Sequence, residues 1–335
     1  MALAAANGAK CSVGDQLSPS GEMDMVTYDL IGSAYSELEE KEEWLDNVES
    51  VADIAIISPE AYVGDFESDL SKYKVIILPD VIRTDIDFAK RLREFCDCGG
   101  KVLATGKSAL YENSNEFCLN LGAEWIKENP YKPDYFRPLE KIKDMGDTGY
   151  IMYGNGEKIR CIGNELGIRE NPYFNRTRAH FCSHQHTPNS CEYGGAGMTE
   201  GKDGIYIAWN IFADYAQSGE LHLKQMAIFA LDRLLDSAKT LKTNLPAQGI
   251  VTLMKQSDRL ICHLLYASPV KRGNGIEVIE DIVPIYNVEL AIKTDKKINK
   301  VYLAPQKEDI DFTYENGYIS VKLDKIECHQ MVVFE

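Results

Sequence analysis

The sequence predicts a doubly wound α/β domain, with a mostly parallel sheet, followed by a small all-β sandwich. Unbroken apolar runs at residues 54–57, 75–78 and 102–104 are typical of parallel strands that are covered on both faces. After residue 249 the pattern changes to alternating apolar and polar residues, which is typical of antiparallel strands. A chain of 335 residues is long enough for two or three such domains.

The α/β prediction rests on residues 73–110, which have the pattern strand, helix, strand. The apolar run at 75–78 is followed by Pro79-Asp80, and we expect Thr84 to cap a helix over residues 85–98. A second buried strand then ends at the turn Thr105-Gly106. This is a crossover unit of a parallel sheet, so any ligand site is expected at the carboxyl ends of its strands.

Residues 1–45 do not resemble the start of a domain. A short strand is expected at residues 9–13 and a helix at 25–43, and one strand followed by one helix is a single repeat of a (β/α)8 barrel. Asp15 and Gln16 come just after the strand, where barrel enzymes hold active-site groups. Two interpretations stay open, because these two residues could also serve only to shape a turn, which is the interpretation that the pattern alone favours.

The chain is expected to divide into a barrel repeat at residues 1–45, the α/β domain at 46–243 and the β-sandwich at 244–335. Within the α/β domain we expect an irregular insertion at 127–150 and a polar loop at 163–203, with the last helix at 221–235. Further elements are expected as a helix at 113–121, strands at 123–126, 151–153, 159–162 and 204–209, a linker at 241–248, and sandwich strands at 250–253, 260–266, 286–292, 300–303, 318–323 and 331–334.

Composition narrows the possible partners. The formal net charge of −16 argues against nucleic acid and anionic membrane surfaces and suits neutral ligands such as sugars. The nine cysteines show no disulfide framework, which is typical of reduced thiols. Without a signal peptide or a long apolar run, the sequence predicts a cytoplasmic protein. No cofactor is predicted.

The turn after the strand at 102–105 is the position where a catalytic nucleophile would be expected. In class I glutamine amidotransferase-like domains this position carries a nucleophilic cysteine on a tight elbow. Here the elbow reads Thr105-Gly106-Lys107-Ser108 and has no cysteine, and no G-x-S-x-G surrounds Ser108. The spacing of a phosphate-binding loop is also absent, because Lys101 stands where the first glycine is needed. We therefore predict no catalytic residue.

A histidine-rich loop at residues 176–192 is the second place where chemistry is possible. Arg178, His184, His186 and Glu192 are candidate ligand contacts. The loop could also serve only as structure or as an interface, and histidines beside Cys182 and Cys191 are suitable zinc ligands. Because no recognised ligand spacing occurs, no metal site is predicted.

Several segments together resemble the carboxy-terminal half of a glycoside hydrolase related to the family 42 β-galactosidases and, more loosely, to α-L-fucosidases. These segments are NGAKCSVGDQLSPSG, the elbow without its nucleophile, SHQHTP, ICHLLYASPVKRG and IEVIEDIVPIYNVEL. The resemblance implies a last barrel repeat, then a β-galactosidase trimerisation domain with an amidotransferase-like or flavodoxin-like fold, then a β-sandwich. It covers nearly the whole chain, but the catalytic barrel is missing except for its last repeat.

The resemblance implies an accessory and oligomerising region of a carbohydrate-active enzyme, with a carbohydrate or a catalytic barrel chain as partner and a homo-oligomeric state. Two alternatives stay open. One is a free-standing glycosidase or amidotransferase-like enzyme that uses the strand-end pocket of the α/β domain, and the other is a sugar-binding protein.

Overall fold

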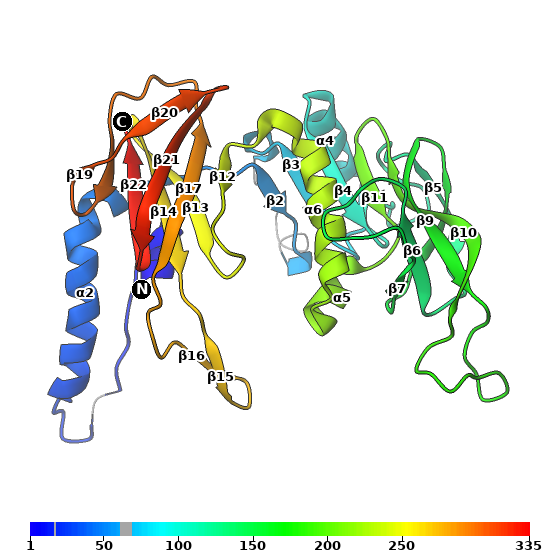
Figure 1. Ribbon diagram of the computed structural model, residues 1–335, viewed down its shortest axis with the longest axis horizontal. Helices are drawn as coiled ribbons and strands as arrows, with labels where there is room; N and C mark the ends of the chain where they lie inside the picture. The colour runs from blue at the N-terminus through cyan, green and yellow to red at the C-terminus, as the bar shows by residue number, and fades with distance from the viewer. Residues whose placement is uncertain (17, 61–68) are drawn as a thin grey trace. The chain divides into compact units, whose positions relative to one another are not determined.

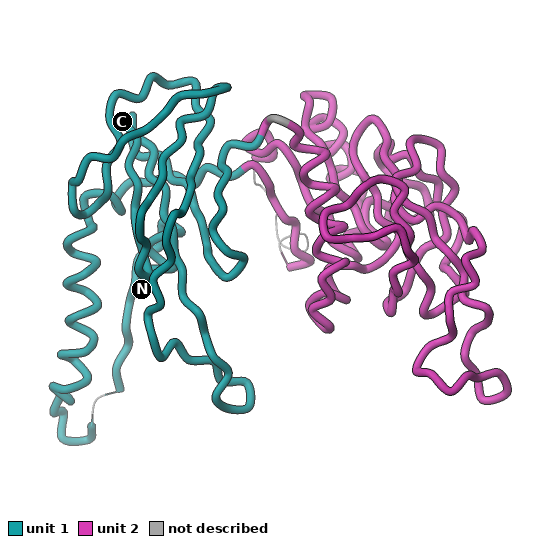
Figure 2. The backbone as a smooth tube through the Cα atoms, viewed as in Figure 1, with its two compact units in different colours: residues 1–52, 239–335 teal, residues 53–238 magenta. Residues whose placement is uncertain are grey.

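The computed structural model describes residues 1–16, 18–60 and 69–335. The chain forms two compact units (Figure 2), of which unit 1 contains residues 1–52 and 239–335 and unit 2 contains residues 53–238. No helix within the described ranges is long and apolar enough to cross a membrane.

Unit 2 is built on a mixed sheet, which confirms the α/β class. Strands β2 (Ile54–Ile56), β3 (Val75–Leu78), β4 (Lys101–Thr105) and β11 (Gly204–Ile207) are parallel neighbours in that order. Beyond β11 the sheet continues with antiparallel strands, so it is less regular than the doubly wound sheet expected. These strands are β5 (Ala123–Glu128), β6 (Asp134–Pro138), β7 (Tyr150–Met152), β8 (Glu157–Cys161), β9 (Asn164–Pro172) and β10 (Asn189–Glu200).

Three helices of unit 2 are α4 (Ile86–Asp97), α5 (Ile211–Ser218) and α6 (Leu221–Leu235), and α4 and α6 bury apolar side chains against the sheet (Figure 1). The cap of α4 is Asp85, whose side chain accepts a hydrogen bond from the Phe88 amide at 2.7 Å. The expectation that Thr84 caps this helix was wrong. Thr84 is buried, and its amide donates to the Leu110 carbonyl at 2.8 Å.

Other expectations for unit 2 were also wrong. Residues 163–203, expected as a loop, contain β9 and β10, and the supposed insertion at 127–150 contains β6. Glycines and register shifts in β10 interrupt the alternation that marks a strand. Gly197, for example, would bring a β-carbon within 2.8 Å of the Trp209 ring, so the position favours glycine over a typical strand residue. Residues 113–121 form turns, not a helix.

Unit 1 contains the expected β-sandwich. A six-stranded sheet and a four-stranded sheet share one core, to which the first contributes Leu264 and Val332 and the second Leu290 and Val321. Residues 241–243, expected in a linker, form strand β12. The strands are β1 (Glu49–Ser50), β12 (Leu241–Thr243), β13 (Ile250–Gln256), β14 (Arg259–Tyr266), β15 (Val270–Gly273), β16 (Ile276–Val278), β17 (Ile285–Lys293), β18 (Val301–Ala304), β19 (Glu308–Asp309), β20 (Phe312–Glu315), β21 (Tyr318–Ile326) and β22 (Cys328–Phe334).

The first 52 residues are part of unit 1. Helix α1 (Ala2–Ala6) precedes α2 (Met25–Leu45), which confirms the helix expected at 25–43, whereas residues 9–13 form no strand. The end of α2 packs on the six-stranded sheet, where the buried Trp44 indole donates to the Tyr302 hydroxyl at 3.1 Å. Strand β1 then pairs with β13. The sequence pattern separates residues 1–45 from the sandwich, but these contacts hold them to it.

Three buried basic side chains, the first of which is Lys41 on α2, lie in a row. Lys41 Nζ is 3.4 Å from His329 Nδ1, and His329 Nε2 is 3.0 Å from His263 Nδ1. Because an ammonium only donates, His329 must accept at Nδ1 and carry its proton on Nε2. His263 then carries its proton on Nε2, which is buried without a partner within the described ranges. The geometry therefore requires both imidazoles to be neutral.

Candidate functional site

The elbow, residues 105–108, has the tight backbone that its sequence predicts. Gly106 has φ +57°, and a β-carbon there would lie 2.0 Å from Asn210 Oδ1, so only glycine fits. The elbow is held from both sides, because the Gly106 amide donates to the Ile207 carbonyl at 3.0 Å and the Lys107 amide donates to the Asp80 carbonyl at 2.7 Å. The turn therefore joins the carboxyl ends of β3, β4 and β11.

Asp80 occupies the position at this strand end where a catalytic acid could be placed. Its carboxylate accepts hydrogen bonds from Thr105 Oγ1 at 2.6 Å and from the Ala213 amide at 2.7 Å, so it caps helix α5. Burial raises the pKa of Asp80, while these hydrogen bonds oppose the rise. The carboxyl group is 5 % exposed and its oxygens are engaged, so it supports the fold and does not face a substrate.

Ser108 is likewise enclosed. The residue is fully buried, and its Oγ accepts a hydrogen bond from the Ile82 amide at 3.0 Å. A nucleophile needs an adjacent base and access to substrate, and neither the position nor the hydrogen bond of Ser108 provides them. The strand end of unit 2 is thus filled by protein groups.

Replacing Ser108 with alanine tests this assignment. We expect a loss of about 1–3 kcal/mol in the free energy of unfolding, because the buried Ile82 amide loses its acceptor. Ser218→Ala is the matched control, since its hydroxyl bonds the Asp214 carbonyl on an exposed helix face, and it should change stability little. Urea denaturation measures both. A glutamine-hydrolysing activity of the chain that Ser108→Ala abolishes would contradict a structural role.

A cluster of buried charges lies in the antiparallel part of unit 2. Asp134 accepts hydrogen bonds from Trp209 Nε1 and Asn129 Nδ2, each at 2.7 Å, and forms an ion pair with Arg169. The Arg169 guanidinium also donates to the Glu157 carbonyl at 2.8 Å and lies 4.2 Å from the Trp209 ring centroid. Burial raises the pKa of Asp134, which the charge of Arg169 opposes. The Arg169 Nε has no hydrogen-bond partner among the described residues, but both Asp134 oxygens are bonded, so the cluster is a buried ion pair without access to a substrate.

The predicted ligand contacts fall in two places that belong to different units. Asp15 and Gln16 are exposed in unit 1, where the Tyr28 hydroxyl donates to Asp15 at 3.0 Å, and this hydrogen bond raises the pKa of Tyr28. The other candidates lie in unit 2, where Arg178, His184 and His186 are on the loop between β9 and β10 and Glu192 is on β10.

Within the histidine-rich loop, Arg178, His184 and Glu192 are exposed. His186 Nδ1 lies 3.3 Å from the Tyr153 hydroxyl, and the two rings meet edge to face. In the portion of the chain that the structure describes, no three His, Cys, Asp or Glu side chains converge as metal ligands. Of the predicted ligand contacts, His186 therefore has a ring contact with Tyr153, and Arg178, His184 and Glu192 are exposed to solvent.

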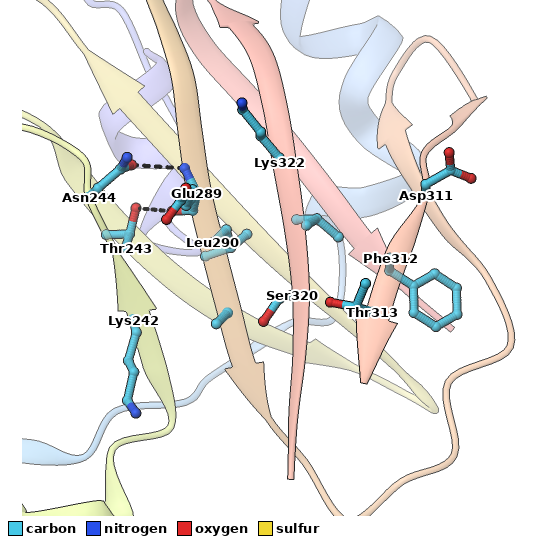
Figure 3. A pocket seen from close by; sticks show the side chains of 12 residues that line it. Lys242, Thr243, Asn244, Glu289, Leu290, Asp311, Phe312, Thr313, Ser320 and Lys322 are labelled. Atoms are coloured by element: carbon cyan, nitrogen blue, oxygen red, sulfur yellow. Dashed lines mark hydrogen bonds between the residues drawn. The ribbon is translucent and has the colours of Figure 1, made fainter. Parts of the chain in front are cut away.

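Sequence reasoning did not find a groove on the outer face of the four-stranded sheet of unit 1 (Figure 3). It has a volume of about 550 Å³ and lies over β12, β17, β21 and β20. The strand register places Lys242, Ala291, Ser320 and Thr313 in one row across these strands. Small side chains in the middle of the row leave the hollow that we call the sheet groove.

Comparison with known proteins relates this arrangement to glycosidases. Residues 61–124 match the family model described as the β-galactosidase trimerisation domain. With this match, the mixed α/β unit and the β-sandwich make the chain similar to the non-barrel portion of the family 42 β-galactosidases. The resemblance stated from the sequence is thereby confirmed. No match was found among curated proteins.

Solved structures extend the similarity over the whole chain. The chain is 46 % identical to α-L-fucosidase isoenzyme 2 from Paenibacillus thiaminolyticus, with a TM-score of 0.95, covering 100 % of this chain and 56 % of that one. The β-galactosidase from Bacillus circulans sp. alkalophilus shares the fold at 15 % identity and a TM-score of 0.54, covering 90 % and 44 %. The β-galactosidase from Rahnella sp. R3 also shares the fold, at 13 % identity and a TM-score of 0.54. The match covers 95 % of this chain and 46 % of that one. The chain therefore spans about half the length of the structures it matches.

Proposed function

We propose that this chain is the accessory and oligomerising region of a carbohydrate-active glycoside hydrolase, and that a (β/α)8 barrel, in the same chain or a separate one, supplies the catalysis. The observation that carries the proposal is the filled elbow. Asp80 and Ser108 are both buried and both bonded to backbone amides, so neither of these two residues is available as a nucleophile.

Exposed apolar side chains on unit 1 support a barrel partner. Val26 and Leu30 on the first half of α2 are 79 % and 72 % exposed, and Ile276 on the β15–β16 hairpin is 58 % exposed. Helix α2 and this hairpin project beyond the same end of the sandwich (Figure 1). Apolar surface of this kind usually marks an interaction site. Since the chain covers 56 % of the α-L-fucosidase, the rest of such an enzyme is long enough to form the partner.

The proposal assigns a role to each of the predicted ligand contacts. Asp15 and Gln16 precede α2 at the projecting end of unit 1, where a completed barrel would bring them near its substrate. Arg178, His184, His186 and Glu192 are proposed as contacts to carbohydrate or to a neighbouring subunit. Because these side chains are mostly exposed in this chain, the partner would have to complete any site they form.

Activity assays test the proposal directly. The purified chain is expected not to cleave chromogenic β-D-galactosides or α-L-fucosides and not to hydrolyse glutamine, because its described residues form no barrel and the elbow Thr105-Gly106-Lys107-Ser108 carries no accessible nucleophile. Turnover of any of these substrates by the chain alone would contradict an accessory role and favour a free-standing enzyme.

Assembly is the second property to test. We expect a homo-oligomer, a dimer or a trimer, because closed symmetric assembly is the commonest outcome for exposed apolar surfaces and residues 61–124 match a trimerisation domain. Replacing Leu30 and Ile31 with glutamate should weaken any contact made through α2, whereas Asp29→Lys on the same helix should not. Multi-angle light scattering measures the mass of each. A monomer at micromolar concentration that neither change affects would contradict the prediction.

A further inference from the structure

We propose that the sheet groove of unit 1 is a binding site for a neutral saccharide. This inference goes beyond the accessory role and does not depend on it, because the groove lies entirely within the four-stranded sheet and would bind its ligand whether or not a barrel or a second copy is attached.

The shape follows from the strand register. Ala291 on β17 faces Ser320 on β21, and Ser320 in turn faces Thr313 on β20. These side chains are short, whereas the neighbouring rows on the same face carry longer ones, such as Lys322 and Glu289 on one side. The row of short side chains therefore forms the floor of the groove, and the longer side chains form its rims. The groove volume of about 550 Å³ is within the range of small-ligand sites.

The walls offer both donors and acceptors. Lys322 and Glu289 are directly opposite in the ladder, yet no ion pair joins them within the part of the chain described. The Ser320 and Thr313 hydroxyls and the Asp311 carboxylate likewise have no hydrogen-bond partner among the described residues. Elsewhere on the sandwich, exposed charges such as Arg272 and Glu280, or Lys300 and Asp309, are paired. The polar groups around the groove are thus available to a ligand (Figure 3).

This mixture of groups selects the class of ligand. A phosphate or another anion would meet Glu289 and Asp311 at the walls and a chain of net charge −16, and a cation would meet Lys242 and Lys322. A saccharide instead needs donors, acceptors and some apolar surface, and the Ala291 side chain supplies apolar surface beside the polar groups. Lys242 is also held in place, because its Nζ lies 4.0 Å from the Tyr318 ring centroid.

Saturation-transfer difference NMR on the full chain tests the inference. The probes are methyl β-D-galactopyranoside, L-fucose and cellobiose. We expect binding of at least one probe with a dissociation constant of about 1 mM, as befits an open groove with few contacts. Ser320→Tyr fills the middle of the groove with a side chain that strands accept readily and should abolish the signal.

The matched control is Asp324→Tyr, which adds the same side chain on the same strand outside the groove, and it should leave the signal unchanged. Thermal unfolding of both variants verifies that they fold. No transfer to any of the three probes, or equal transfer to Ser320→Tyr, would overturn the inference, as would stronger binding of inorganic phosphate. A failure here leaves the accessory role standing, because that role is judged by turnover and by mass.

Discussion

Replacing Arg169 with leucine is expected to lower the free energy of unfolding of unit 2 by about 3–5 kcal/mol, the usual cost of removing one member of a buried ion pair. Arg169 is fully buried and forms an ion pair with Asp134, which is 1 % exposed. Without the guanidinium, Asp134 must either stay charged in the core or take up a proton. Urea denaturation of the full chain measures the loss.

The control for Arg169 is Arg160→Leu. Arg160 lies on the adjoining part of the same sheet and pairs with Glu124, but its side chain is 68 % exposed, so the change should cost less than about 1 kcal/mol. In the double variant Asp134→Leu with Arg169→Leu, part of the loss should return, because no uncompensated charge remains. Equal effects of Arg169→Leu and Arg160→Leu would show that the buried cluster does not stabilise unit 2.

Acidification is expected to destabilise unit 1 by on the order of 5 kcal/mol between pH 6.5 and pH 4. Burial, together with the Lys41 charge, lowers the pKa of His263 from 6.5 to about 4 and that of His329 to about 3. The unfolded chain then binds more protons than the folded chain in this range. Stability contributed by the neutral pair is therefore complete above pH 6.5 and is lost as the pH falls. Urea midpoints at successive pH values measure the slope.

Replacing both His263 and His329 with leucine should flatten the pH dependence of unit 1, because the side chains that must stay neutral are gone. Lys41 loses a partner in that variant but keeps its contact with Glu37. His184→Leu is the control, since this histidine is exposed in the loop of unit 2 and should leave the slope unchanged. A pH dependence that persists in the double variant would show that other groups cause it.

The order of most elements could be predicted from the sequence, because buried strands and amphipathic helices leave a strong apolar pattern. The run at Val75–Leu78 and the periodicity of Leu221–Leu235 gave their elements correctly. Strands β9 and β10 were missed because their residues are largely polar and glycine, and some of their buried polar groups, such as Arg169, are satisfied by side chains distant in the sequence. Such partners cannot be identified from local pattern.

The candidate sites show the same limit. The absence of a nucleophile at the elbow was visible as Gly106-Lys107 in the sequence, whereas the enclosure of Ser108 depends on Ile82 in a neighbouring segment. The sheet groove depends on the register of four strands, two of which, β12 and β20, were not among the expected strands. One-residue shifts in register would have placed its small residues on the opposite face, so only the structure could reveal it.

Because unit 1 is assembled from residues 1–52 and 239–335, unit 2 is an insertion within it, and this has a consequence for synthesis. On the ribosome the first segment emerges long before the strands on which it packs. Trp44 and Leu45 therefore have no packing partners in unit 1 while unit 2 is synthesised. Domains generally fold as units during synthesis, and closing a loop of nearly two hundred residues is slow compared with local folding. Unit 2 should therefore acquire its structure before unit 1 can be completed.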